Sequence, residues 1–152
     1  MREAERIADQ LRRAYRGEAW HGPALRVLLE GVTAERAAAR PVAGAHSIWE
    51  LVLHVAAWQG VVLRRVGGED AREPEEGDWS DVAEPDEARW RGALARLDES
   101  TERLIEAVTG LDDSLLEEGV GRATLYAHLH GIIQHNLYHA GQIALLKKTF
   151  GG

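Results

Sequence analysis

Two histidines near the end of the chain have a spacing that metal sites use. His135 and His139 stand four residues apart in the stretch QHNLYHAGQ. Four residues is just over one turn of an α-helix, so both imidazoles would lie on one face of a helix. Imidazole is a good ligand for Zn²⁺, Ni²⁺, Cu²⁺ or Fe²⁺. The pair is a candidate metal clamp, and the alternative is two core histidines that hydrogen-bond to their neighbours.

A two-histidine clamp needs at least a third ligand, and His54 is the best candidate. It lies seven residues after Ser47, among apolar residues that repeat every three or four positions. This spacing places His54 about two turns inside another helix, at the depth of a core. Three imidazoles with an open position are typical of a catalytic metal site. A hydrogen-bonded core histidine is again the alternative.

Other polar residues can complete or surround such a site. Tyr138 and Gln142 flank the clamp and are candidates to donate to a bound ligand or a substrate, or simply to pack. A fourth protein ligand would close the site and make it structural. The candidates for that ligand are His128, Glu50 and Gln142. His128 can alternatively support a ligand from behind or lie between helices.

The remaining histidines and the tryptophans are predicted to lie outside the site. His46 falls at the start of a helix, and His130 falls on an outer face. His21 lies in an interrupted helix, where it and Trp20 can line a cleft. Core spacing predicts a packing role for three tryptophans, which are Trp49, Trp58 and Trp90.

Four segments with helical periodicity must position these side chains. They cover about residues 2–16 with a continuation to about residue 30 after a break near Gly22–Pro23, residues 47–66, residues 86–109 and residues 124–148. Ser47 and Glu50, in the sequence SIWE, predict a capping box. Asp112 and Asp113 are predicted to cap a short helical turn. No segment has a strand pattern.

The connection at residues 69–85 is long, acidic and contains prolines. A connection of this length in a compact domain is functional or crosses a helical bundle. The pattern predicts an all-α protein, a four-helix bundle with one long crossover connection, in a single domain over residues 1–152.

The composition excludes several classes of protein. There are 25 acidic and 18 basic residues, a formal net charge of −7, and no basic patch of the kind that nucleic-acid binders carry. No cysteine is present, so disulfides and thiolate sites are excluded. No apolar run approaches the length of about 20 residues that a membrane span needs. We expect a cytoplasmic protein without nucleic-acid or membrane partners.

Two segments resemble the signature regions of the DinB/YfiT-like superfamily. They are HSIWELVLHVAAW at residues 46–58 and HNLYHAGQIALLKK at residues 135–148. The resemblance implies a four-helix bundle and a metal triad at His54, His135 and His139, with zinc or nickel as the ion. It also implies a homodimer and relatives that include transferases and isomerases dependent on low-molecular-weight thiols such as bacillithiol or mycothiol.

The residues and the resemblance leave three functions open. The first is a metal-dependent enzyme of the thiol S-transferase or hydrolase type, acting on a small-molecule substrate. The second is a non-catalytic metal-binding or interaction module in which the ion staples the second long helix to the fourth. The third is a bundle without metal, whose histidines are packed and hydrogen-bonded.

Overall fold

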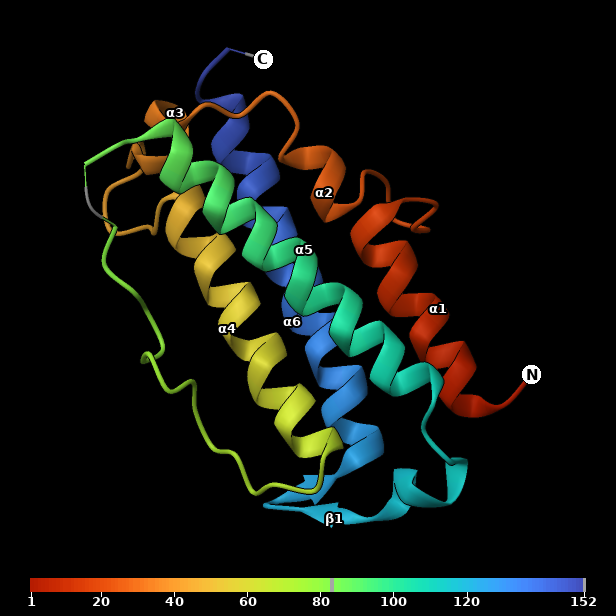
Figure 1. The fold of residues 1–152 in the computed structure, drawn as a ribbon. Coiled ribbons are helices and arrows are strands. Elements are labelled where there is room, and N and C mark those ends of the chain that lie inside the picture. The colour runs from red at the N-terminus through yellow and green to blue at the C-terminus, as the bar shows by residue number, and fades with distance from the viewer. Residues whose placement is uncertain (83, 152) are drawn as a thin grey trace.

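The computed structural model describes residues 1–82 and 84–151, and helices dominate it (Figure 1). The four long helices are α1 (Glu3–Arg16), α4 (Ile48–Val66), α5 (Glu87–Thr109) and α6 (Leu125–Lys148). The shorter elements are α2 (Leu25–Leu28), α3 (Ala34–Ala38), the 3-10 helix η1 (Asp113–Glu117), and a hairpin of β1 (Gly119–Val120) and β2 (Ala123–Thr124). The predicted all-α class is confirmed.

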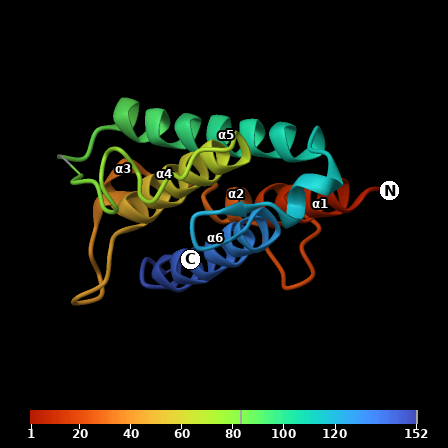
Figure 2. The same ribbon diagram turned by 90° about the horizontal axis from the view of Figure 1, so that it is seen from below.

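The long helices form a closed ring. Both α1 and α4 pack against α5 and α6, and Figure 2 shows α5 and α6 on opposite sides of them. In Figure 1, α4 and α5 run in the same direction, because the chain between them returns along the outside of α4. This return, residues 67–86 apart from residue 83, is called the crossover segment below. It is the predicted long connection.

Side-chain caps fix where the long helices begin. The Ser47 hydroxyl accepts from the Glu50 amide at 3.1 Å, and the Glu50 carboxylate accepts from the Ser47 amide at 2.7 Å. This pair is the predicted capping box. Asp86 caps α5 and Thr124 caps α6 in the simpler way, each accepting from a backbone amide three residues on. The predicted starts of these three helices are confirmed.

The N-terminal region follows the prediction. The first helix ends at Arg16, as expected, and a second helical piece begins at Leu25, after Gly22–Pro23. Gly17 and Glu18 both have positive φ, at 153° and 62°, which helical backbone does not allow. The apolar stripe therefore continues in a separate short helix, α2, and not in a kinked α1.

Two details of the connection between α5 and α6 were not predicted. Asp112 caps η1 as expected, but the Asp113 carboxylate accepts from the Glu3 and Ala4 amides and so caps α1 from across the bundle. The β1–β2 hairpin has only two residues in each strand. Strands this short carry no visible alternation of polar and apolar residues, so the sequence pattern could not reveal them.

The core consists of two apolar clusters, one toward each end of the bundle. On α6, the cluster at the start of the helix ends at Ile132 and the other begins at Ala140. Polar side chains occupy the layer between them, including buried Gln59, whose oxygen accepts from Ser100 and Thr101. Within the described residues, each helix falls short of the length or the hydropathy that a bilayer span requires.

We expect Ser47→Ala to lower the free energy of unfolding by about 1 kcal/mol, because it leaves a helix N-terminus without its cap. Urea denaturation followed by circular dichroism measures the change. Thr33→Ala is the control, since Thr33 caps only the five-residue α3 through a longer contact of 3.3 Å. A loss for Ser47→Ala no larger than that for Thr33→Ala would contradict the assigned role of the cap.

Candidate metal centre

Three histidines converge in the polar layer between α4 and α6. His54 comes from α4, and His135 and His139 come from adjacent turns of α6. His54 and His139 are buried and His135 is half-buried. Each offers one ring nitrogen, and the three nitrogens all lie within 4.8 Å of one another. The structure therefore brings together the three side chains that the sequence singled out, and they are called the histidine cluster below.

The outer ring nitrogens of the cluster are held by hydrogen bonds. The His54 Nδ1–H donates to the backbone carbonyl of Asp78 at 2.7 Å. The His139 Nδ1 lies 2.6 Å from the Gln142 side-chain oxygen, and the His135 Nδ1 lies 3.3 Å from the Asn136 side-chain oxygen. An acceptor at Nδ1 leaves the lone pair on Nε2 and fixes the ring, which is how metal-binding histidines are oriented.

The inner nitrogens face one another. The Nε2 atoms of His54 and His135 are 3.0 Å apart. Two lone pairs at this distance repel unless a proton or a cation lies between them. In the metal-free protein, the repulsion is relieved if His135 carries its single proton on Nε2 and donates it to His54, and His135 then gives up the bond from its Nδ1 to the Asn136 oxygen. A divalent ion bound by both nitrogens would replace that proton.

The distances fit a metal ion with small adjustments. Zinc–nitrogen bonds of about 2.0–2.1 Å in tetrahedral geometry place ligand nitrogens about 3.3–3.4 Å apart. The recorded separations, from 3.0 Å up to 4.8 Å, bracket that value. Among the described residues, no further histidine or carboxylate joins the group. Three imidazole ligands would leave a coordination position open.

Burial keeps these imidazoles in the form that binds metals. It lowers the pKa of His135 to about 4, helped by the nearby His139, and burial also lowers the pKa of His139. Both rings are therefore neutral at pH 7 and keep their lone pairs. The Asp78 carboxylate acts in the opposite direction on both rings, because a negative charge favours a positive charge nearby.

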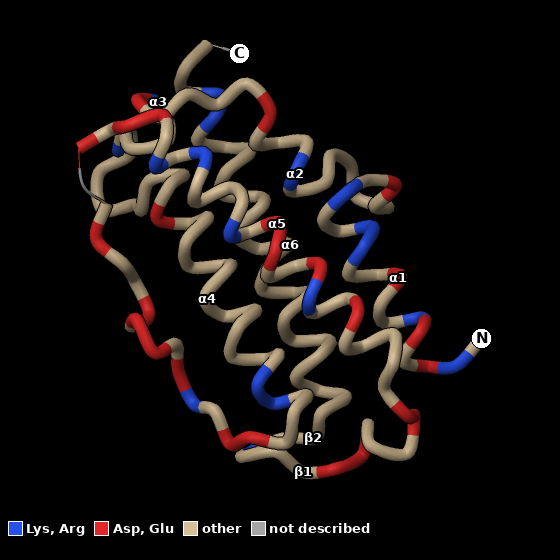
Figure 3. Tube along the Cα trace, in the orientation of Figure 1, with Lys and Arg blue, Asp and Glu red and all other residues tan. Residues whose placement is uncertain are grey.

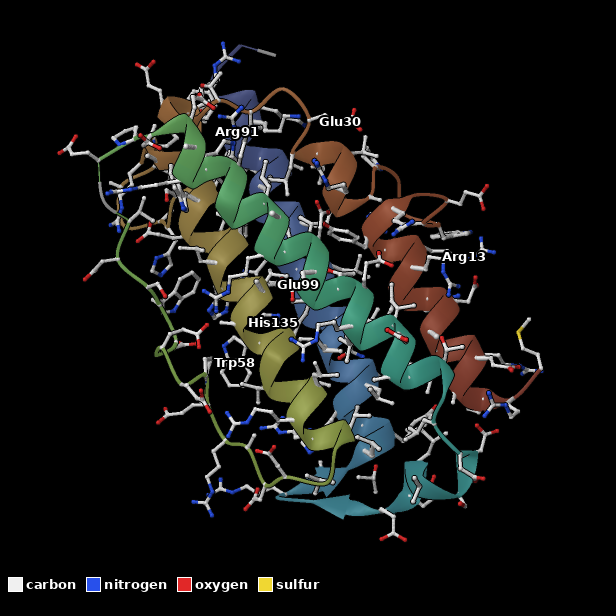
Figure 4. All side chains as sticks on the ribbon, in the orientation of Figure 1. Arg13, Glu30, Trp58, Arg91, Glu99 and His135 are labelled. Carbon is white, nitrogen blue, oxygen red and sulfur yellow. The ribbon has the colours of Figure 1, made fainter. Side chains whose placement is uncertain are left out.

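The crossover segment forms one wall of the site. Its Trp79 ring stacks face to face on His54, with centroids 3.8 Å apart, and its other face stacks on His46 at 3.5 Å. The Trp58 indole N–H donates to the Asp78 carboxylate at 2.7 Å. Figure 4 shows Trp58 on α4, on the side that faces the crossover segment.

Several predicted roles are corrected by these contacts. Trp58 is partly exposed and packs against one core cluster, as expected, but it also anchors the crossover segment through Asp78. His46 stacks against Trp79 and so belongs to the surroundings of the site. His128 is neither a ligand nor a support for one, because its ring bonds to Arg65 and to the Val120 carbonyl.

The other candidate residues near the clamp are Gln142, Tyr138 and Glu50. Gln142 contacts His139 as a hydrogen-bond acceptor. Tyr138 lies beside the His139 ring and is 67% exposed. The Glu50 carboxylate is engaged by the Ser47 cap and by Arg40, so it does not supply a fourth ligand.

Three more of the residues considered above lie away from the cluster. Trp20 and His21 are exposed and lie outside the histidine cluster, so the cleft predicted for them is not seen. His130 is half-buried against Tyr126, where an outer-face position had been expected.

The sequence reasoning missed Asp78, Trp79 and Asn136. Asp78 and Trp79 lie in an acidic connection without periodicity, so no local pattern marks them. Asn136 follows His135 directly and is buried. The only signal in the sequence was its place beside the apolar stripe of the last helix, because an asparagine on a buried helix face needs a hydrogen-bond partner.

The fold and the site together define an all-α bundle with three converging histidines on two of its helices. The sequence model of the DinB superfamily matches residues 19–143, which include all three. The match spans most of the chain, and the protein belongs to the DinB superfamily. No curated protein and no solved structure matches the chain. The family membership expected from residues 46–58 and 135–148 is confirmed.

We expect acid to destabilise the metal-free protein partly through His135. Its pKa is about 4 in the folded chain against an ordinary 6.5. The unfolded chain therefore binds more protons between these values, and the free energy of unfolding falls as the pH drops from about 6.5 to 4. Urea denaturation over this range measures the slope. His135→Gln should make it shallower, whereas the exposed His21→Gln should not. Equal slopes for His135→Gln and the wild type would refute the assignment.

Proposed function

We propose that this protein binds one divalent metal ion, zinc or nickel, at the histidine cluster and uses it in an enzymatic reaction. The observation that carries the proposal is the set of three converging imidazoles with oriented rings and no fourth histidine or carboxylate among the described residues. A structural site would more often be closed by four protein ligands. An open position is what a reacting group requires.

The reaction that these features support best is S-transfer from a low-molecular-weight thiol, with hydrolysis as the related alternative. When bound, a divalent ion lowers the pKa of a thiol or of water, so that a nucleophile forms near neutral pH. In S-transfer, the sulfur forms a bond to an electrophilic carbon, the leaving group departs with the electron pair, and the thiol proton passes to solvent. The proposal that a thiol is the cofactor rests on family membership.

The residues around the cluster have separate tasks in this proposal. Asp78, Asn136 and Gln142 hold the imidazoles in orientation. Trp79 covers one face of His54 and excludes water from it. The Asp78 carboxylate, 3.4 Å from the His54 Nδ1, offsets part of the positive charge that an ion would bring.

An apolar cavity near the cluster offers a place for the electrophilic substrate. It has a volume of about 330 Å³ and is lined by Val42, His46, Leu51, Gln142 and Leu145 among others. Gln142 also contacts His139, and His46 also stacks on the Trp79 that covers His54. The exposed Tyr138 phenol lies beside the His139 ring, outside the lining of this cavity, and is a further candidate donor to a substrate.

We expect protein purified without a histidine tag to contain about one zinc or nickel ion per chain. His54→Ala, His135→Ala and His139→Ala should each weaken metal binding at least tenfold, because each removes one of three ligands. Inductively coupled plasma mass spectrometry and a competing chelator measure content and affinity. His21→Ala is the control, and circular dichroism checks the fold. Stoichiometric metal in all three variants would exclude the cluster as the site.

Turnover distinguishes the enzyme from a module in which the ion staples α4 to α6. The three ligands come from two different helices, and this observation favours the stapling module. Both functions predict that a chelator lowers the melting temperature, because an ion that binds only the folded state stabilises it. Only the enzyme predicts that a panel of thiols and electrophiles, or of hydrolysable esters and amides, is turned over and that His139→Ala abolishes this. Full metal loading without turnover on any panel would favour the staple.

A further inference from the structure

A second group of charged side chains surrounds a cavity at the opposite end of α4 from its capping box. The cavity has a volume of about 440 Å³ and lies between the end of α4, the start of the crossover segment, the β1–β2 hairpin and the start of α6. Its charged and titratable lining residues, Arg65, Asp70, Arg72, Arg122 and His128, define the arginine pocket. Figure 3 shows basic residues at the end of α4, beside the acidic start of the crossover segment.

Arg65 is the fixed member of the pocket. It is half-buried, its Nε–H donates to the Ala71 carbonyl at 2.7 Å, and an Nη1–H donates to the His128 Nδ1 at 3.1 Å. An arginine has five N–H donors, and both recorded acceptors are uncharged. Within residues 1–82 and 84–151, no carboxylate oxygen is recorded within 4.0 Å of this guanidinium. Burial lowers the pKa of Arg65, and the Asp70 carboxylate, which forms no close ion pair with it, only partly offsets this. An incoming anion would therefore gain from the partly buried cation.

His128 holds this guanidinium in place. Its Nε2–H donates to the Val120 carbonyl at 2.8 Å, so its Nδ1 carries the lone pair that accepts from Arg65. The Val120 carbonyl belongs to the hairpin, and the Ala71 carbonyl belongs to the crossover segment. Arg65 is therefore oriented by two backbone segments before any ligand arrives, and preorganisation of this kind lowers the cost of binding.

The rest of the pocket is positive in an otherwise acidic chain. Arg72 and Arg122 are exposed and line the same cavity. Asp70 is its only lining carboxylate among the described residues, 3.7 Å from Arg72. Three arginines against one aspartate leave a local charge of +2, whereas the whole chain carries −7. A local field of this sign concentrates anions at the pocket.

Gly121 explains how Asp70 fits into the pocket. Gly121 has φ of 62° at the turn of the hairpin, and a Cβ there would lie 2.7 Å from the Asp70 Oδ1. The absence of a side chain lets the carboxylate rest against the hairpin backbone. Asp70 thus occupies the space that an external anion would take, and the two would compete for the arginines.

We propose that the arginine pocket binds a doubly charged tetrahedral oxyanion, as inorganic phosphate or as the phosphate group of a small phosphate monoester. A dianion matches the local charge of +2, and a phosphate presents paired oxygens that suit the planar, forked guanidinium. His128 lies seven residues before His135 on α6, about 10 Å along the helix axis. The pocket is thus distinct from the histidine cluster, and the proposal does not depend on metal binding there.

The test is isothermal titration of chelator-treated protein with inorganic phosphate and with phenyl phosphate, at constant ionic strength and pH 7.5. We expect both to bind at one site, at least tenfold more tightly than acetate. Arg72→Gln combined with Arg122→Gln should weaken phosphate binding at least tenfold. The control combines Arg12→Gln with Arg91→Gln, which removes the same charge elsewhere. Figure 4 shows Arg91 near the start of α5, at the end of the bundle opposite the hairpin.

Equal phosphate affinity in the pocket variant and the control variant would overturn the proposal, as would equal binding of acetate and phosphate. A second variant tests the competition directly. Asp70→Asn removes the internal carboxylate and should tighten phosphate binding at least threefold, a gain that a merely structural role of Asp70 would not produce. Unchanged or weaker phosphate binding in Asp70→Asn would contradict the proposed occupancy of the pocket.

Discussion

The hydrogen bond from the His54 Nδ1–H to the Asp78 carbonyl links the parts of this structure that matter most for the site. A buried imidazole needs partners for both of its nitrogens. The crossover segment satisfies the outer nitrogen, which leaves the inner one for the centre of the cluster. The same contact holds Trp79 over the ring. The orientation of a buried side chain on α4 thus depends on a loop more than twenty residues later in the sequence.

The topology of the bundle makes this contact possible. Because α4 and α5 run in the same direction, the chain must travel the full length of the bundle between them (Figure 1). A short turn between antiparallel helices would leave the outer side of the cluster open to water. The long connection of this fold therefore has a local consequence, since it supplies the backbone acceptor and the aromatic cover that α4 and α6 lack.

The crossover segment is also anchored at its beginning. Arg65 donates to the Ala71 carbonyl beside the arginine pocket, and Trp58 donates to Asp78 beside the histidine cluster. Both donors lie on α4, so one helix holds the segment at two places. Polar contacts of this kind position a segment that has little apolar surface of its own to bury. The two candidate binding sites consequently share α4, α6 and the crossover segment without sharing a residue.

The sequence alone determined the helices and the three histidines. Periodicity, the Ser47–Glu50 capping box and the caps at Asp86 and Thr124 are local features, so they gave the long helices and their starts. Helical spacing put His135 and His139 on one face, and depth in the second long helix indicated His54. The end of the first helix near Arg16 was predicted as well, but the positive φ of Glu18 just beyond it is not encoded in any periodic pattern.

Only the tertiary structure decided which groups surround those histidines. Asp78 and Trp79 meet His54 through a long-range contact that has no local signature. Tertiary packing likewise turned His128 away from the cluster and toward Arg65, although helical spacing favoured the same face. A spacing rule gives the side of a helix but not the partner on the neighbouring segment. The histidine cluster could therefore be predicted from the sequence. The residues that orient its rings, and the arginine pocket, depend on where separate segments of the chain meet.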